Sequence, residues 1–140
     1  MKPAHRRPPF VERPKGSVSS LLGTRLGGGP GLAIADDGML LGLALREWIA
    51  DVAGQAGIPL QPYVAKGINT DGRAIQQHGG GIPVMSLATP MRYAHCHSGI
   101  VKRSDYNHML RLLGLLVEGL DAKTVGALTD WPRLCKGPRP

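Results

Sequence analysis

Apolar runs separated by glycine and proline divide the chain into alternating strand-like and helix-like segments. The continuous run at 31–35 has the length of a buried strand, and residues 41–52 repeat apolar positions at helical spacing. Gly57 and Pro59 supply the cap and the breaker that end this helix. Residues 60–65 and 82–88 read as two further strands, and Pro62 favours a place at a sheet edge for the first of them.

Two more helices complete the pattern. A short helix is predicted over 71–77, and a final one begins at Ser104 or Asp105, either of which can cap it. Its broad apolar stripe consists of Met109, Leu112, Leu113, Leu116, Val117 and Leu120. The order strand, helix, strand, helix, strand, helix predicts an α/β fold with a mostly parallel sheet flanked by helices. A sheet of three strands is narrow for this class, and the apolar stripe of the last helix is broad enough to need more cover than three strands offer. We therefore expect this chain to be a section of a larger domain.

Composition and charge assign the ends of the chain. A length of 140 residues with 42% hydrophobic content suits one folded domain. Residues 1–20 are rich in Pro and Arg without periodicity and are predicted to be a disordered basic tail, followed by a folded unit at 21–128 and a loose tail at 129–140. The net charge of +7 comes mainly from the first tail, which could touch nucleic acid; its single aromatic residue, Phe10, argues against that partner.

The cysteines and the hydropathy of the chain indicate where in the cell the protein is located. Cys96 and Cys135 form no CxxC motif, and no signal peptide or run long enough to cross a membrane is visible. These features favour a cytoplasmic protein without a membrane partner.

The candidate metal-binding and catalytic residues lie in loops. Asp36, Asp71 and His95 are expected at or after the carboxyl ends of strands, where an α/β sheet collects its ligands, and carboxylate and imidazole are both zinc ligands. The alternative is structural, with Asp36 capping the following helix and Asp71 forming an Asx-turn. Cys96 beside His95 and His97 could also be a nucleophile with its base. Spacing alone leaves these possibilities open.

Three sequence blocks carry a resemblance to a known family. They are GPGLAIAD at 29–36, NTDGRAI at 69–75, and a run from GGIP at 80–83 through PMRYAHCH at 90–97 to the start of the last helix. In this order, residues 29–120 resemble the carboxyl-terminal part of the tetrahedral, glutamyl-aminopeptidase-like metallopeptidases, some of which were catalogued as endoglucanases. Cys96 stands where the family usually has serine.

The resemblance implies a partial three-layer zinc-aminopeptidase-like domain and a function. Such enzymes use two divalent metals, zinc or cobalt, to remove the amino-terminal residue from peptides, and they form large hollow homo-oligomers. Asp36 would bind one metal and His95 the other, while Asp71, Arg92 and Tyr93 would orient the site or the substrate. The family's adjacent glutamates, bridging aspartate and first histidine have no counterpart in this chain. No residue is therefore assigned a catalytic role.

The resemblance thus implies a metal-dependent aminopeptidase that is truncated and either inactive or dependent on a partner. Two other functions remain open. The chain could be a non-catalytic assembly module that joins a full-length paralogue. Alternatively, its basic tail could bind nucleic acid.

Overall fold

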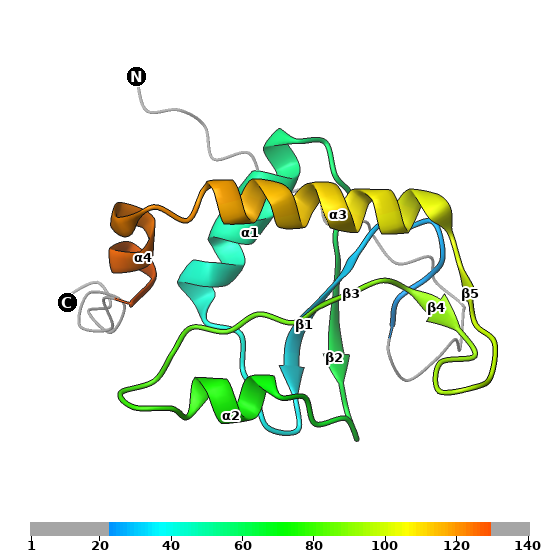
Figure 1. Cartoon of the computed structure of the whole chain (residues 1–140), viewed down its shortest axis with the longest axis horizontal. Helices are drawn as coiled ribbons and strands as arrows, with labels where there is room; N and C mark the ends of the chain where they lie inside the picture. The colour runs from blue at the N-terminus through cyan, green and yellow to red at the C-terminus, as the bar shows by residue number, and fades with distance from the viewer. Residues whose placement is uncertain (1–22, 130–140) are drawn as a thin grey trace, which may run out of the picture.

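The computed structural model describes residues 23–129, so the predicted tails at 1–20 and 129–140 lie outside it except for Thr129. Figure 1 shows a small sheet with helices on both sides. The elements are β1 (Gly31–Asp36), α1 (Leu43–Gln55), β2 (Gln61–Ala65), α2 (Gly72–Gln76), β3 (Leu87–Ala88), β4 (Met91–Arg92), β5 (Ile100–Val101), α3 (Arg103–Glu118) and α4 (Ala122–Thr129).

The sheet has the order β2-β1-β3, with β1 in the centre. β1 and β2 are parallel, as expected, and β2 is an edge strand that contains Pro62. β3 is antiparallel to β1, with Gly31 opposite Ala88, so the expected parallel direction of the third strand is wrong. That strand is also shorter than the predicted 82–88. Pro83 cannot donate a ladder hydrogen bond, and the segment reaches β1 first through the bond from the Ala33 N–H to the Ser86 carbonyl oxygen (3.0 Å).

Successive side chains of β1 point to opposite faces of the sheet, so the core consists of two hydrophobic clusters. Leu32 and Ile34 belong to the larger cluster, which is built with α1, α3 and α4 on one face of the sheet. Ala33 points the other way and packs with Met39 and Val84. The expected α/β class with a partial three-layer arrangement is confirmed, because helices cover one face and a thinner layer that includes α2 covers the other.

The end of α1 follows from its sequence. Gly57 adopts a φ of +65°, its N–H bonds to the Gly54 carbonyl oxygen (3.2 Å), and the Ile58 N–H reaches the Ala53 carbonyl oxygen (2.9 Å). This pattern is a Schellman motif, in which glycine tolerates the left-handed backbone that closes the helix. The buried Ile58 supplies the apolar contact that accompanies it, so the predicted glycine cap is confirmed.

α3 buries Leu112 and Leu116 completely, but its start differs from the expectation. The residue before the first turn is Lys102, and the expected cap Asp105 instead bonds to a loop far away in the sequence. The β4–β5 pair and α4 were not predicted. Among the helices of residues 23–129, none combines the length and the apolar character needed to cross a membrane.

Candidate functional site

Asp36 ends β1 and organises the turn that follows it. One carboxylate oxygen, Oδ1, accepts the backbone N–H groups of Gly38 (2.8 Å) and Met39 (2.6 Å). The other, Oδ2, accepts the hydroxyl of Thr70 (2.6 Å) and its backbone N–H (3.3 Å). The carboxylate therefore joins the end of β1 to the loop before α2, which lies 34 residues later.

These hydrogen bonds also set the charge state of Asp36. The Thr70 hydroxyl is the largest cause that lowers the pKa of this carboxyl; desolvation opposes it, and the backbone N–H groups of Gly38, Met39 and Thr70 add to the lowering. Donors that favour the ionised form keep the group an anion at neutral pH. Four hydrogen-bond donors already contact the two oxygens of the Asp36 carboxylate, as expected for a residue that holds the fold together. A metal ion would have to displace some of these hydrogen bonds to bind it.

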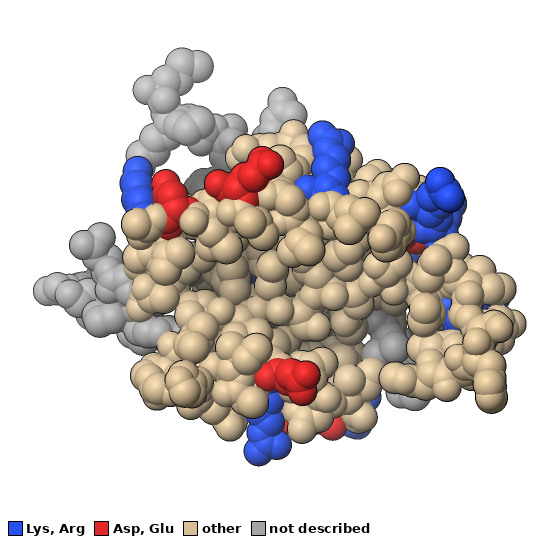
Figure 2. Space-filling model, viewed as in Figure 1, with Lys and Arg blue, Asp and Glu red and all other residues tan. Residues whose placement is uncertain are grey.

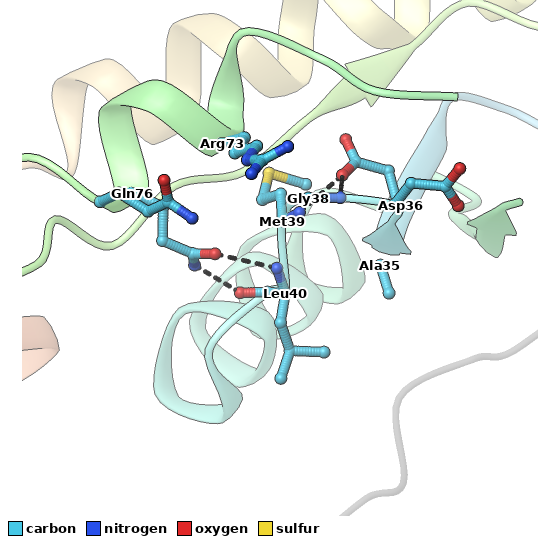
Figure 3. A pocket seen from close by; sticks show the side chains of 9 residues that line it. Ala35, Asp36, Gly38, Met39, Leu40, Arg73 and Gln76 are labelled. Atoms are coloured by element: carbon cyan, nitrogen blue, oxygen red, sulfur yellow. Dashed lines mark hydrogen bonds between the residues drawn. The ribbon is translucent and has the colours of Figure 1, made fainter. Parts of the chain in front are cut away.

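A hollow of about 390 Å³ lies beside this turn, between the start of α2 and the segment after β1. Its polar lining consists of Asp36, Asp37, Arg73, Gln76 and Gln77. Figure 3 shows Asp36, Arg73 and Gln76 around it. The Gln76 amide accepts the Leu40 N–H (3.0 Å) and donates to the Leu40 carbonyl oxygen (2.6 Å), so it closes one side of the hollow. The sequence pattern did not single out Gln76, because its partner is 36 residues away and no local motif joins them.

Asp71 immediately precedes α2 and is exposed. Its side chain forms no capping hydrogen bond, so the structure gives no support to the alternative of an Asx-turn at this position. Asp37, the residue after Asp36, holds the loop after β2, because its carboxylate accepts the Gly67 N–H (3.1 Å). Asp36 and the loop that carries Asp71 are thus brought together, as the sequence predicted.

Arg92 is the last residue of β4, and Tyr93 and His95 lie in the turn that leads from it to β5. Within residues 23–129, Tyr93 (φ 60°) and His95 (φ 66°) are the two non-glycine residues with a left-handed backbone. A bulky side chain rarely adopts this conformation, and such strain is concentrated at functional sites. Arg92, Tyr93 and His95 are all exposed, as is the free Cys96.

The direction of β3 changes the path by which the chain leads from the sheet to His95. Because β3 is antiparallel to β1 and Ala88 lies opposite Gly31, the chain leaves the sheet at the end opposite Asp36. The six residues of β1 separate these ends by about 16 Å at the usual rise per residue. Figure 1 shows β4 and β5 projecting from the side of the molecule, away from the tip of β1. The expected approach of Asp36 to the loop that carries Thr70 and Asp71 is therefore found, whereas the approach of His95 to them stays a prediction.

The residues present do not make a complete metal site. Among residues 23–129, no group of three or more His, Cys, Asp or Glu side chains is placed to hold a metal ion. Zinc sites need about three protein ligands each. His95 is exposed and could supply one of them, whereas Asp36 already accepts four hydrogen bonds.

Comparison with known proteins identifies the family. The M42 glutamyl aminopeptidase family matches residues 13–112. FrvX of Escherichia coli (strain K12) is 34% identical over 107 residues, and the glutamyl aminopeptidase of Lactococcus lactis subsp. cremoris (strain MG1363) is 28% identical over 107 residues. The crystal structure of a TET aminopeptidase from a marine sediment archaeon of the Thaumarchaeota superposes with a TM-score of 0.71 at 36% identity.

The chain belongs to the M42 glutamyl aminopeptidase family, as the three sequence blocks predicted. Each of these three matches covers 76% of this chain. The matched part spans 30% of the length of each relative.

Proposed function

We propose that the chain supplies one section of the catalytic domain of a metal-dependent aminopeptidase, acting on peptides in the cytoplasm. The family match and the fold support the reaction class. The observation that carries the proposal is the strained turn in the family's Arg-Tyr-x-His block. Tyr93 and His95 adopt left-handed backbone conformations there, which holds the imidazole in a defined, exposed place.

In our proposal, His95 is the main metal ligand that this chain supplies. Zinc or cobalt would complete its coordination with ligands from outside residues 23–129, since these residues contain no complete site. Arg92 and Tyr93 flank it and would position the substrate. Asp71 would act in the same way from the α2 loop, and Asp36 would bind metal only if the Thr70 loop released its carboxylate.

A chimera tests this proposal. In the L. lactis glutamyl aminopeptidase, the matched section would be replaced by the corresponding 107 residues of this chain. We expect the chimera to hydrolyse aminoacyl amides, to lose at least about 100-fold in kcat/KM on His95→Ala, and to keep activity on His97→Ala. Activity retained in the His95→Ala chimera, or a folded chimera without activity, would contradict the proposal.

The full 140-residue chain alone provides the complementary measurement. Because a single free ligand does not hold zinc tightly, calorimetric titration should show no tight binding, and an aminoacyl-amide assay should show no turnover. Turnover by the chain alone that is lost in an Asp36→Ala, His95→Ala double variant would instead show that the missing ligands come from this chain or from a second copy.

A non-catalytic assembly role is the second candidate function. It is favoured by the large apolar side chains that α3 leaves exposed. Nucleic-acid binding has less support, because residues 23–129 carry nine Lys and Arg against eight Asp and Glu. A nucleic-acid complex that survives deletion of residues 1–20 would contradict the tail-binding alternative.

A further inference from the structure

The hollow between α2 and the segment after β1 is lined by charges of both signs. Asp36 and Asp37 line it from the end of β1 and the turn that follows, and Arg73 lines it from α2 (Figure 3). Figure 2 shows basic and acidic side chains close together at the lower border of the molecule, where α2 and the tip of β1 lie in Figure 1. The volume of about 390 Å³ is near the lower end of the range for small-molecule pockets, so a ligand of modest size fits the hollow.

Arg73 is placed by a close contact with Gly38. A Cβ at residue 38 would lie 2.5 Å from the Cδ of Arg73 and 2.9 Å from its Cβ, so the aliphatic stem of the arginine lies against the glycine backbone. The residue is nonetheless exposed, because packing of the stem leaves the charged end accessible. Among residues 23–129, the guanidinium group has no hydrogen-bond or ion-pair partner. The hollow therefore contains a positioned cation that a ligand can reach.

Asp37 supplies the negative charge that a ligand can reach. Both oxygens of Asp36 already accept hydrogen bonds from the Thr70 loop and from the turn after β1. Asp37 is exposed, and its Oδ1 accepts the Gly67 N–H (3.1 Å). Within the described part of the chain, its Oδ2 has no donor. A carboxylate oxygen of this kind favours an ammonium group as its partner.

The remaining wall of the hollow is partly apolar. Ala35, Met39 and Leu40 line it beside the charged residues. The two hydrogen bonds between the Gln76 amide and the backbone of Leu40 hold this wall against α2. The Leu40 side chain is 65% exposed, so an apolar group of a ligand would remove part of its surface from water.

We propose that this hollow binds a small zwitterion with an apolar side chain, of which the free amino acid leucine is a simple example. The carboxylate of the ligand pairs with Arg73, its ammonium group pairs with Oδ2 of Asp37, and its side chain lies on Leu40. A ligand with both charges is favoured over an anion, which would meet the two carboxylates, and over a cation, which would meet the guanidinium group. The site needs neither His95 nor a metal ion, so the proposal is independent of the aminopeptidase activity proposed above.

An NMR titration of the full 140-residue chain tests the site, because backbone amide shifts both detect weak binding and locate it. We expect L-leucine to cause saturable shifts at the amides of Gly38 and Leu40, with a Kd of about 0.1–10 mM. Leucinamide lacks the carboxylate and N-acetyl-leucine lacks the ammonium group, so each should bind at least about tenfold more weakly. No saturable shift with L-leucine, or equal binding of the two analogues, would overturn the proposal.

Two variants assign the charges. Arg73→Met keeps the stem but not the guanidinium group, so it should weaken L-leucine at least about tenfold and leave leucinamide unchanged. Asp37→Asn keeps an acceptor for the Gly67 N–H; it should weaken L-leucine by a similar factor and leave N-acetyl-leucine unchanged. Arg103→Met on α3 and Asp51→Asn on α1 are the matched controls, because both positions are exposed and lie outside the hollow.

The controls should bind L-leucine as the natural chain does. Unaltered amide shifts away from the hollow show that each variant keeps its fold. Binding of L-leucine that is unchanged in Arg73→Met or in Asp37→Asn would overturn the proposal, as would shifts confined to residues outside the hollow.

Discussion

The carboxylate of Asp105 accepts a hydrogen bond from the backbone N–H of Gly29, which lies 76 residues earlier in the chain (3.0 Å). Its second oxygen accepts the Gly27 N–H (2.6 Å). Gln61 completes the arrangement by donating to the carbonyl oxygens of Gly29 (2.7 Å) and Arg25 (3.0 Å). The segment that enters the sheet is thus tied to both α3 and β2, and the fully buried Asp105 is satisfied by backbone donors.

Asp105→Asn should destabilise the fold strongly. The amide keeps one acceptor oxygen but turns an NH₂ group toward a backbone N–H, so one buried donor loses its partner. We expect a loss of about 2–4 kcal/mol in the free energy of unfolding, measured by urea denaturation at neutral pH. Asp51→Asn, at an exposed position on α1, should change it by less than about 0.5 kcal/mol. Equal stability of the two variants would contradict this role of Asp105.

Gly29→Ala tests the backbone of the same segment. Gly29 has a φ of +85°, and a Cβ there would lie 2.1 Å from the Pro59 carbonyl oxygen. The substitution should cost at least about 2 kcal/mol, because strain and a backbone clash act together. Gly126→Ala in α4 is the control, since no atom of residues 23–129 outside the backbone of its own helix lies within 4 Å of its Cβ position; it should stabilise the protein by about 0.5–1 kcal/mol. Thermal unfolding of both variants measures the difference.

Thr70→Val should weaken the fold in a pH-dependent manner. The Thr70 hydroxyl lowers the pKa of Asp36 below its ordinary value of 3.8, so the unfolded chain binds the proton more tightly than the folded one. This stabilisation is fully present above the ordinary pKa and is lost as the pH falls through the lower folded-state pKa. The difference in melting temperature between the natural chain and Thr70→Val should therefore shrink in acid.

Thr129→Val provides the control for that titration. The Thr129 hydroxyl donates to the carbonyl oxygens of Val125 and Gly126 in its own helix, so no carboxylate depends on it. Its effect on the melting temperature should not vary over the same pH range. A constant difference for Thr70→Val would show that Asp36 does not link stability to pH.

Leu116→Ala should reveal which face of α3 belongs to the core. Leu116 is fully buried against the cluster built on β1 and α1, and truncation there should cost about 2–5 kcal/mol in a denaturant titration. The exposed Leu43 should lose less than about 0.5 kcal/mol on the same change. A small effect at Leu116 would mean that α3 is not held against the sheet as described.

Local patterns in the sequence determined the elements whose causes are local. The apolar run of β1, the helical period of α1 and the Gly57 cap depend on residues within a few positions of one another, and all three are found where predicted. Pro62 marked β2 as an edge strand, because proline removes a ladder donor. The family followed from three blocks of sequence, and its match is confirmed.

The tertiary structure alone decided the relations between distant residues. The direction of β3 depends on how the chain returns to β1, and in that direction the chain leaves the sheet after Ala88 at the end opposite Asp36. Asp105 reads as a helix cap in the sequence, yet its carboxylate bonds to Gly27 and Gly29. Hydrogen bonds that span 76 residues have no local signature, because only the packing of whole elements brings their partners together.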